Sequence, residues 1–374
     1  MSKQLARILG VSNRNTLAPT VRFKTPLLKD SCVPATTQFR TFQTSIRGHF
    51  RYTTSKMAGT QPASGGEQRD FARDSLFDLK GRVALVTGMF GISAPFPETI
   101  ADNSIGGGSG IGLMATQALA VNGAKVYITG RTKEKLDRVV ENYGKNIAGE
   151  IVPIQADVGN KEGIQKLLDE YKAKEDCLCI LVNNAGISSN SFQVEANSAQ
   201  EMKENLFDNK DATFEDWNQT YNTNVTGMYF TTAAFLPLLQ KSSEKNQGWS
   251  STVINISSIS GLIQKSQHHF AYNASKGAAV HLTRMLAAEV VSNKLKIRVN
   301  SIAPGVFPSE MTTDGSDETQ KSFIPKEKYT EKVPAGRAGK DQDMAATVLF
   351  FATNQYLVGQ TLAVDGGYTI AAGQ

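Results

Sequence analysis

The sequence predicts an α/β fold in which one parallel sheet carries helices on both of its faces. Three observations support this expectation. Short strands rich in β-branched residues alternate with helical segments, glycines stop the helices, and the alternation runs through most of the chain. With 374 residues and 40% hydrophobic content, the chain can bury a large core. It has no apolar run of about 18 residues, so we expect no membrane-spanning helix.

The segments follow one another as in a doubly wound sheet. The predicted strands are RVALVTG (82–88), KVYITG (125–130), IVPIQADV (151–158), CILVNNAG (179–186), TVINISS (252–258) and IRVNSIAPG (297–305). A helix over 111–123 ends at Gly123, and another is expected over 161–174. We therefore predict a Rossmann-type domain over residues 76–371, a single catalytic domain whose ligand binds at the carboxyl ends of the strands.

The first 56 residues differ in charge from the rest of the chain. They hold ten lysines and arginines and one acid, Asp30, whereas the other residues hold 30 basic and 34 acidic side chains. This Arg-rich and Ser/Thr-rich leader resembles a mitochondrial transit peptide. The alternative is a start at Met57 and a cytoplasmic protein. Residues 57–75 are expected to form a flexible linker. Because the positive charge is confined to the leader, we expect no nucleic-acid partner, and we predict no metal site.

Small and polar residues follow the predicted strands in a characteristic order: Asn183 to Gly186, Ser257 and Ser258, then Tyr272 and Lys276 at the start of a helix, then Pro304 and Gly305. In this order they resemble the short-chain dehydrogenase/reductase family. The resemblance runs from about Leu76 to the closing VDGGYT at 364–369, and its layout is most similar to NADPH-dependent 3-oxoacyl-thioester reductases. It implies a small-molecule or acyl-thioester carbonyl substrate and a homodimer or homotetramer.

Tyr272 and Lys276 are four residues apart and therefore share one face of a helix. A phenol has a pKa near 10, and a neighbouring ammonium favours its ionised form. We therefore expect Tyr272 to transfer the proton and Lys276 to lower the pKa of Tyr272. The resemblance adds that Lys276 hydrogen-bonds the nicotinamide ribose. The alternative is a surface tyrosine beside a solvated lysine.

Two more residues complete the expected catalytic set. Ser258 resembles the family serine that hydrogen-bonds the substrate carbonyl, and Ser257 should face away because alternate strand residues point to opposite sides. Asn224 lies in a helix expected to start near Thr213, and it resembles the family asparagine that holds a water for proton relay. A structural hydrogen bond is the alternative for Asn224.

The residues after the second strand predict the cofactor. NAD enzymes usually place an acid there, on the ribose 2′-hydroxyl. This chain has Arg131, whose guanidinium would pair with a 2′-phosphate, so NADP is the predicted cofactor. By resemblance, Asp157 meets the adenine edge and Thr312 fixes the nicotinamide amide. The other predicted cofactor residues on the strand ends and the helix are Asn184, Tyr272, Lys276, Pro304 and Gly305.

The glycine loop that should hold the cofactor phosphates is interrupted. Joining Thr87 and Gly88 to residues 107–112 restores the family pattern as TGGGSGIG, so residues 89–106 are an insertion of 18 residues. Its length keeps the reading frame and is compatible with a retained intron; the alternative is a genuine insertion that loops out. The domain can fold around it, because a longer loop costs little chain entropy. Phosphate binding is still assigned to Gly88, Gly106, Ser109, Gly110, Ile111 and Gly112.

Three functions remain open on the sequence. The first is an NADPH-dependent carbonyl reductase acting on a 3-oxoacyl thioester. The second is a broad aldehyde/ketone or polyol oxidoreductase, and the third is a catalytically silent protein whose interrupted loop prevents turnover. The polar segment 308–336 is expected to form a mobile lid. Its Lys321, Lys326 and Lys328 are read as a solvated face in preference to a phosphate contact.

Overall fold

The computed structural model describes residues 68–88, 110–309, 311–313, 316–325, 329 and 332–373. These residues belong to one compact unit, Ser64–Gln374. The predicted leader (1–56) and the insertion (89–106) lie outside the described residues. The end of the predicted linker is helical, in two short turns at Gln68–Phe71 and Arg73–Leu76.

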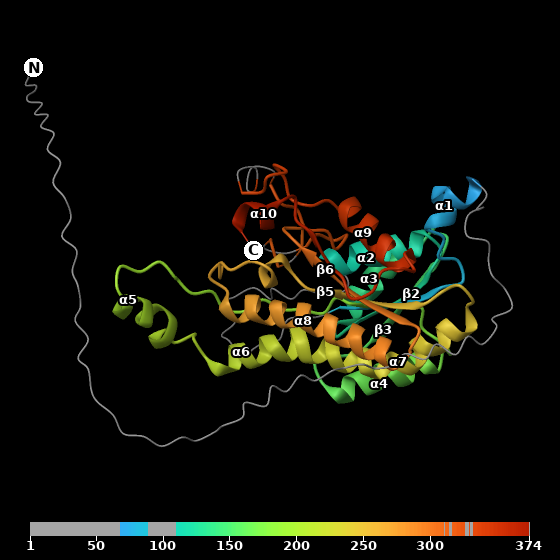
Figure 1. Ribbon diagram of the computed structural model, residues 1–374, viewed down its shortest axis with the longest axis horizontal. Coiled ribbons are helices and arrows are strands. Elements are labelled where there is room, and N and C mark those ends of the chain that lie inside the picture. The colour runs from blue at the N-terminus through green and yellow to red at the C-terminus, as the bar shows by residue number, and fades with distance from the viewer. Residues whose placement is uncertain are drawn as a thin grey trace, which may run out of the picture. The chain divides into compact units, whose positions relative to one another are not determined.

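Seven parallel strands form one sheet in the order β3-β2-β1-β4-β5-β6-β7 (Figure 1). The strands are β1 Val83–Thr87, β2 Lys125–Gly130, β3 Glu150–Gln155, β4 Ile180–Asn183, β5 Ser251–Ile256, β6 Ile297–Pro304 and β7 Thr361–Val364. The predicted doubly wound parallel sheet is thus confirmed. Because β1 pairs with β2 on one side and β4 on the other, the strand order reverses there. Ligands bind such sheets in the crevice at the carboxyl ends of these strands.

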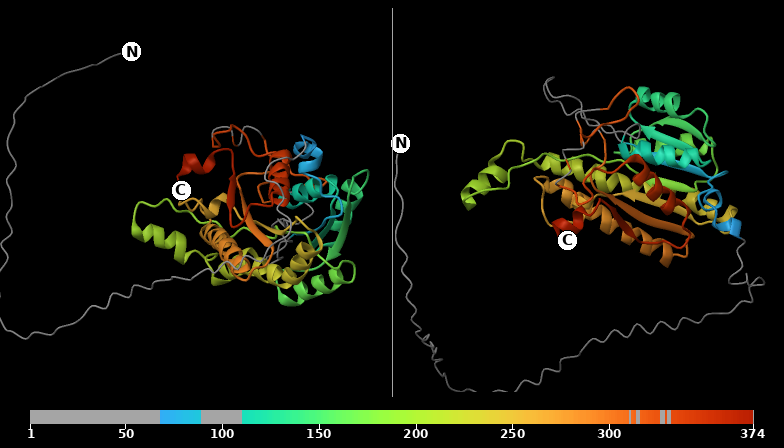
Figure 2. Two further views of the ribbon diagram at one scale, coloured as in Figure 1. Left: turned by 45° about the vertical axis from the view of Figure 1, so that its right-hand side comes forward. Right: turned by 90° about the horizontal axis from the view of Figure 1, so that it is seen from above.

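Helices cover both faces of this sheet. The α-helices are α1 Arg73–Leu76, α2 Gly110–Val121, α3 Lys133–Tyr143, α4 Lys161–Lys172, α5 Ala199–Lys203, α6 Phe214–Tyr221, α7 Met228–Lys245, α8 Phe270–Ser292, α9 Asp341–Thr353 and α10 Tyr368–Ala372. Short π-helical turns cover Glu204–Asp208 and Asn222–Gly227, and a 3₁₀ turn covers Ile259–Gly261. The segment that carries α5 projects from the body of the domain in both views of Figure 2.

Alternating strand residues build two hydrophobic cores. On β1, Ala84 and Val86 face the first core, which contains side chains of α2, α3 and α9. Leu85 faces the second core, which contains side chains of α4, α7 and α8. In Figure 1, α7 and α8 run along one face of the sheet, and α2 and α9 lie over the other. Each central strand is therefore buried on both sides, as its nearly continuous apolar sequence predicts.

Three strands differ most from the prediction, and one of them is β4, which ends at Asn183, three residues before the predicted end at Gly186. β3 ends at Gln155, three residues early, because the Asp157 carboxylate accepts a hydrogen bond from the backbone N–H of Gly159 (2.9 Å) and turns the chain toward α4. β7 was not predicted. Its four residues are half-buried or exposed, so its sequence lacks the apolar run of a central strand.

A buried arginine joins β6 to the end of α9. The Arg298 side chain is only 2% exposed, and its guanidinium donates to the backbone carbonyls of Phe351 (2.9 Å) and Ala352 (2.8 Å) in the last turn of that helix. It also donates to the carbonyl of Ser250 (3.2 Å). Carbonyls in the last turn of a helix lack intrahelical partners, so this arginine satisfies acceptors that would otherwise be buried and unpaired.

Replacing Arg298 with methionine should lower the free energy of unfolding by about 2 kcal/mol or more, because buried carbonyls lose their donors. Urea denaturation measures the change. The matched control is Lys296→Met, since Lys296 is exposed and immediately precedes β6. Equal stability of the two variants would contradict this role for Arg298.

Candidate active site

The crevice between β1 and β4 is built from backbone held by one threonine. The Thr87 hydroxyl, at the end of β1, accepts hydrogen bonds from the backbone N–H groups of Asn184 (3.2 Å) and Ala185 (3.4 Å). The next residue is Gly186. A Cβ there would lie 3.1 Å from Lys276 Nζ and 3.2 Å from Asn224 Oδ1. Glycine at this position therefore lets the strand end approach two of the predicted catalytic side chains.

Asn224 holds the chain segment that follows β4. It lies in the π-helical turn between α6 and α7, a departure from the single helix expected over this stretch. Its Oδ1 accepts from the N–H of Ile187 (2.8 Å), and its Nδ2 donates to the Ile187 carbonyl (2.9 Å) and to Ser275 Oγ (3.0 Å). Both amide N–H groups are thus used within the protein. The Asn224 side chain therefore has a structural use, and its water-holding role stays a prediction.

Ser258 and Tyr272 face each other across the end of β5. Ser258 is buried, and Tyr272 lies in the first turn of α8. Burial raises the pKa of the Tyr272 phenol, and a hydrogen bond with the Ser258 side chain acts in the opposite direction. The neighbouring Ser257 points elsewhere, with its hydroxyl bonded to Ser301 Oγ (2.7 Å) and to the Ile302 carbonyl (3.0 Å). The structure thus separates the two serines as the strand alternation predicts.

Lys276 is a buried lysine that lies close to the ring of Tyr272. Its Nζ lies 5.7 Å from the centre of the Tyr272 ring and donates to the Ile256 carbonyl (3.1 Å). Burial lowers the pKa of Lys276 to about 8. The raised pKa of Tyr272 comes mainly from burial, so the expected lowering of that pKa by Lys276 stays a prediction.

The segment after β4 and the loop before α8 form one wall of this site. The Ser189 hydroxyl accepts from the backbone N–H of Tyr272 (3.2 Å), and the N–H of Phe192 donates to the His268 carbonyl (2.8 Å). The His268 ring Nδ1 lies 3.0 Å from the Phe192 carbonyl oxygen. Hydrogen bonds therefore join these two segments, which are far apart in the sequence, beside Tyr272.

The first turn of α2 lies at the carboxyl end of β1, where a phosphate-binding turn belongs. It begins with Gly110, Ile111 and Gly112. Gly110 has a φ of 56°, and a Cβ there would lie 2.7 Å from that of Ser309. Gly88 donates its N–H to the Thr129 carbonyl (2.8 Å). Gly106 and Ser109 lie outside the described residues, so their predicted phosphate contacts stay predictions. Glycine is required at position 110, both by this φ angle and by the contact with Ser309, as in a turn that brings backbone N–H groups close to a phosphate.

Arg131 and Asp157 follow β2 and β3 at the same edge of the sheet. The Arg131 carbonyl accepts from Gln155 Nε2 (2.6 Å), which ties the turn after β2 to the end of β3. The Asp157 carboxylate also lies 3.3 Å from Asn160 Nδ2, so it is used to start α4. The sheet thus brings both residues to the side of the crevice where an adenosine half would lie.

Pro304 and Gly305 end β6 on the other side of the crevice. The Gly305 N–H donates to the Val364 carbonyl (2.9 Å), and a Cβ on Gly305 would lie 2.7 Å from the Cα of Asp365. Thr312 lies in the following turn, where its hydroxyl accepts from Ser309 N–H (3.0 Å) and donates to the Phe307 carbonyl (2.7 Å). The Thr312 hydroxyl therefore forms hydrogen bonds with the backbone of its own turn, and its contact with a nicotinamide amide stays a prediction.

Ser309 is a further residue at this end of the crevice that the sequence did not single out. It is the residue of this turn that lies against Gly110 at the start of α2. The sequence gives only its spacing after Pro304 and Gly305 as a clue. Serine and threonine are equally plausible hydroxyl donors in a polar loop, so the residue types do not single out Ser309.

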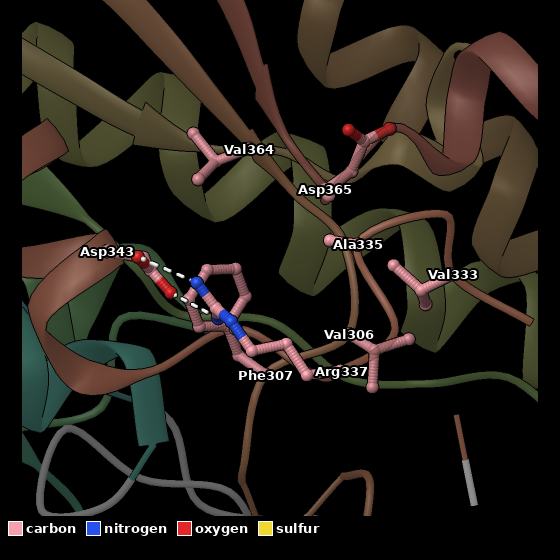
Figure 3. Close-up of a pocket in the computed structure, with 10 residues that line it drawn as sticks. Val306, Phe307, Val333, Ala335, Arg337, Asp343, Val364 and Asp365 are labelled. Carbon is pink, nitrogen blue, oxygen red and sulfur yellow. Dashed lines mark hydrogen bonds and ion pairs between the residues drawn. The ribbon is translucent and has the colours of Figure 1, made fainter. Parts of the chain in front are cut away.

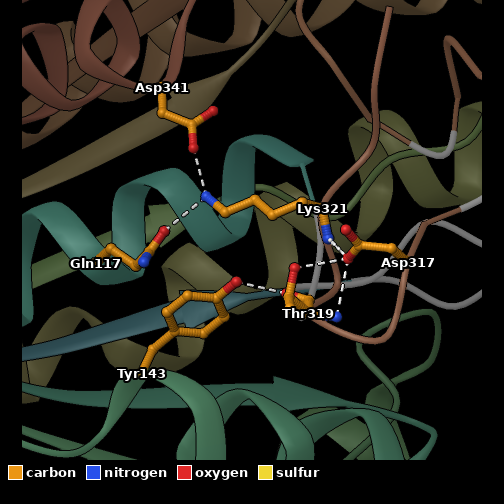
Figure 4. Close-up of polar contacts among 6 residues, drawn as sticks. All are labelled: Gln117, Tyr143, Asp317, Thr319, Lys321 and Asp341. Carbon is orange, nitrogen blue, oxygen red and sulfur yellow. Dashed lines mark hydrogen bonds and ion pairs between the residues drawn. The ribbon is translucent and has the colours of Figure 1, made fainter.

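Part of the expected lid is anchored to the domain (Figure 4). Lys321 forms an ion pair with Asp341 of α9 and donates to Gln117 of α2 (2.9 Å). The Tyr143 hydroxyl of α3 donates to the Thr319 carbonyl (2.5 Å). Residues 317–321 therefore differ from a mobile lid, and Lys321 serves as an anchor. Lys326 and Lys328 lie outside the described residues.

A cavity of about 180 Å³ lies behind the end of β6 (Figure 3). Its walls are mostly apolar, with an ion pair between Arg337 and Asp343 (2.7 Å) on one side. The lining residues are Val306, Phe307, Val333, Ala335, Arg337, Gly339, Asp343, Val364, Asp365 and Gly366. Because neither Tyr272 nor Ser258 lines it, this cavity is not the place where the phenol would meet a substrate.

Two other kinds of site are not found in the described part of the chain. It holds no group of three or more histidine, cysteine, aspartate or glutamate side chains able to bind a metal ion. None of its helices is both long enough and apolar enough to cross a membrane.

The lowered pKa of Lys276 predicts a pH-dependent stability. Below about pH 8 this lysine is charged in the folded and the unfolded chain, and burying the charge costs free energy. Between pH 8 and its ordinary value of 10.5, the unfolded chain binds the extra proton, so the wild type gains stability as pH rises.

Lys276→Met should therefore raise the free energy of unfolding at pH 7 by about 1 to 3 kcal/mol, and this advantage should shrink by pH 10. Denaturant titrations at several pH values measure it. Lys265→Met, at an exposed position before the same helix, is the control and should show no such trend. An advantage that stays constant from pH 7 to pH 10 would contradict the assignment.

Comparisons with known proteins agree with this geometry. Residues 106–369 match a family model described as enoyl-(acyl carrier protein) reductase. The short-chain dehydrogenase/reductase PhomF of Diaporthe leptostromiformis is 37% identical over 297 residues, which cover 78% of this chain and 92% of that protein. The 3-oxoacyl-(acyl-carrier-protein) reductase FabG of Chlamydia pneumoniae is 32% identical over 266 residues, covering 71% and 94%.

A solved structure shows the same architecture. The Pseudomonas aeruginosa RhlG/NADP active-site complex superposes with a TM-score of 0.60 at 31% identity, and the match covers 78% of this chain and 98% of that one. The family match, the parallel sheet and the ordered residues at its carboxyl edge lead to one conclusion: this chain belongs to the short-chain dehydrogenase/reductase family of oxidoreductases.

Proposed function

We propose that the protein is an NADPH-dependent carbonyl reductase that converts a ketone into an alcohol, with Tyr272 as the proton donor. The observation that carries this proposal is the meeting of Ser258, Tyr272 and Lys276 at the end of β5. A hydroxyl and a phenol that face the same point can both hydrogen-bond one carbonyl oxygen.

Tyr272 carries the proton that the reductive direction needs, because a phenol with a pKa at or above its ordinary value is protonated at neutral pH. Burial also makes this phenol a weaker acid, so proton donation requires groups that favour the phenolate. As the proton leaves Tyr272 Oη for the carbonyl oxygen, the hydrogen bond from Ser258 favours the phenolate that remains. Lys276, whose pKa is about 8, is mostly charged at pH 7 and adds a positive charge near the ring. The nicotinamide cofactor supplies the hydride when it is bound.

NADP is the proposed cofactor because of the residue type after β2. Arg131 stands where an acid would bind a ribose 2′-hydroxyl, and a guanidinium suits a 2′-phosphate. The RhlG relative, which was solved as an NADP complex, gives independent support. The adenosine side would be held by Arg131 and Asp157, and the nicotinamide side by Lys276, Gly305 and the Ser309 turn.

The proposed substrate class is a 3-oxoacyl thioester. The support is the likeness to FabG, named a 3-oxoacyl-(acyl-carrier-protein) reductase, and to the family model with an acyl-carrier description. The competing substrates are free aldehydes, ketones and polyols. A panel that pairs a 3-oxoacyl thioester with its free 3-oxo acid and with simple ketones separates these classes by kcat/KM.

Tyr272→Phe should lower NADPH-dependent turnover about 100-fold or more, the usual scale for a lost general acid, and leave NADPH affinity nearly unchanged. The change removes one hydroxyl and little volume. Stopped-flow turnover and NADPH fluorescence titration measure the two effects. The control is Tyr356→Phe, because Tyr356 is fully exposed. A protein that binds NADPH, but whose turnover is equally low with and without the Tyr272 hydroxyl, would identify the catalytically silent alternative.

Arg131→Ala should reduce the preference for NADPH over NADH by about 10- to 100-fold, the scale of a hydrogen bond between charged groups. The ratio of kcat/KM for the two cofactors measures this preference. Arg138→Ala is the matched control, since Arg138 is exposed on α3, two turns farther along. A ratio that stays the same in Arg131→Ala would rule out NADP selection by this residue.

A further inference from the structure

The closing motif VDGGYT forms a turn that places Tyr368 beside the loop before α8. The Asp365 carboxylate accepts from the backbone N–H groups of Gly367 (2.9 Å) and Thr369 (2.7 Å). Gly366 and Gly367 have φ angles of 61° and 90°, a region that glycine adopts without strain. The turn starts α10, whose first residue is Tyr368.

Tyr368 is connected to Ser258 by a chain of hydrogen bonds. Its hydroxyl accepts from Gln267 Nε2 (3.0 Å), and Gln267 Oε1 accepts from Ser260 Oγ (2.9 Å). The backbone N–H of Ser260 donates to Ser258 Oγ (3.1 Å). Ser258 is the side chain whose interaction with the phenol lowers the pKa of Tyr272. Three side chains therefore link the end of the fold to the reacting pair.

The loop that carries Gln267 is held in an unfavourable backbone conformation. Gln267 and His268 have φ angles of 52° and 68°, which cost non-glycine residues about 1 to 2 kcal/mol each. The Gln267 side chain holds this loop on one side, and the two hydrogen bonds between His268 and Phe192 hold it on the other. Strain of this kind persists where the surroundings enforce it, and it clusters at functional sites.

We propose that Gln267 and Tyr368 are positioning residues that hold the Ser260 turn and, through it, keep the Ser258 hydroxyl on the Tyr272 phenol. The inference rests on the proposed carbonyl reduction at Tyr272. A glutamine suits the task, because its amide offers one acceptor to Ser260 and one donor to Tyr368 at the same time. Neither side chain touches the reacting atoms, so each acts through Ser258.

The test compares Gln267→Leu, Tyr368→Phe and the double variant with the wild type. Each single change should lower kcat about 10-fold with little change in the KM for NADPH, because only the reacting pair is disturbed. The double variant should be no worse than Gln267→Leu, since one break already interrupts the chain. Tyr356→Phe is the control and should match the wild type.

Gln267→Glu distinguishes positioning from bulk packing. A carboxylate accepts from Ser260 on one oxygen and from a rotated Tyr368 hydroxyl on the other, so this variant should recover most of the lost kcat. The pH profile of kcat gives a second readout. Loss of the Ser258 hydrogen bond should move the basic limb to higher pH in Gln267→Leu and leave it in place in Gln267→Glu. Unchanged profiles, or kcat losses in the single variants that multiply in the double variant, would overturn the proposal.

A direct titration separates this proposal from the proposed function. Ultraviolet absorbance follows phenolate formation, and subtracting the curve of each variant with the added change Tyr272→Phe isolates the step of Tyr272. That step should move to higher pH in Gln267→Leu and in Tyr368→Phe. If the wild type reduces no carbonyl compound, the proposed function fails, but this shift still supports the positioning role. A Tyr272 step that does not move would overturn it.

Discussion

The site depends on a pair of buried asparagine side chains that tie two strands to two helices. Asn183 at the end of β4 donates to Asn255 on β5 (2.9 Å) and to Thr232 on α7 (2.8 Å). Asn255 in turn donates to Thr283 on α8 (2.9 Å). Asn183 Oδ1 has no hydrogen-bond partner among the residues that the structure describes, but the bonds that the two amides donate to Thr232 and Thr283 would be lost if α7 or α8 shifted against the sheet. This network places the helix that carries Tyr272 and Lys276.

Placement next to the sheet has an electrostatic consequence. Burial raises the pKa of the Tyr272 phenol and lowers the pKa of the Lys276 ammonium, so each group is moved toward its neutral form. A neutral phenol is the state that can donate a proton, and a lysine with a pKa of about 8 still carries charge at pH 7. Desolvation thus moves the pKa of Lys276 toward neutral pH and the pKa of Tyr272 away from it, so proton donation by Tyr272 depends on the groups that favour its phenolate.

Much of the fold could be predicted because the central strands are buried on both faces and therefore read as short β-branched runs. β7 was not predicted from the sequence, because its half-buried and exposed residues do not form such a run. The sequence predicts which residues form the site and in what order, but it does not predict which groups they contact. Asn224 looks the same in sequence whether it holds a water or clamps Ile187, and only the three-dimensional contacts distinguish the two. Likewise, Ser309 and Thr312 are both hydroxyl residues of one turn, and the fold places Ser309 against α2. The raised pKa of Tyr272 depends on burial, which a four-residue spacing does not reveal.

Hydride transfer is the most direct test of the account. The full-length chain, and a chain that lacks residues 89–106, would be given NADPH deuterated at the transferable C4 position and a 3-oxoacyl thioester, and the product analysed by mass spectrometry. We expect an alcohol with one deuterium on its carbinol carbon. Transfer that appears only after the deletion would show that the insertion closes the glycine turn of an otherwise intact reductase. Product without deuterium, or no product from either chain with any carbonyl compound of the substrate panel, would contradict the assignment of this site to NADPH-dependent carbonyl reduction.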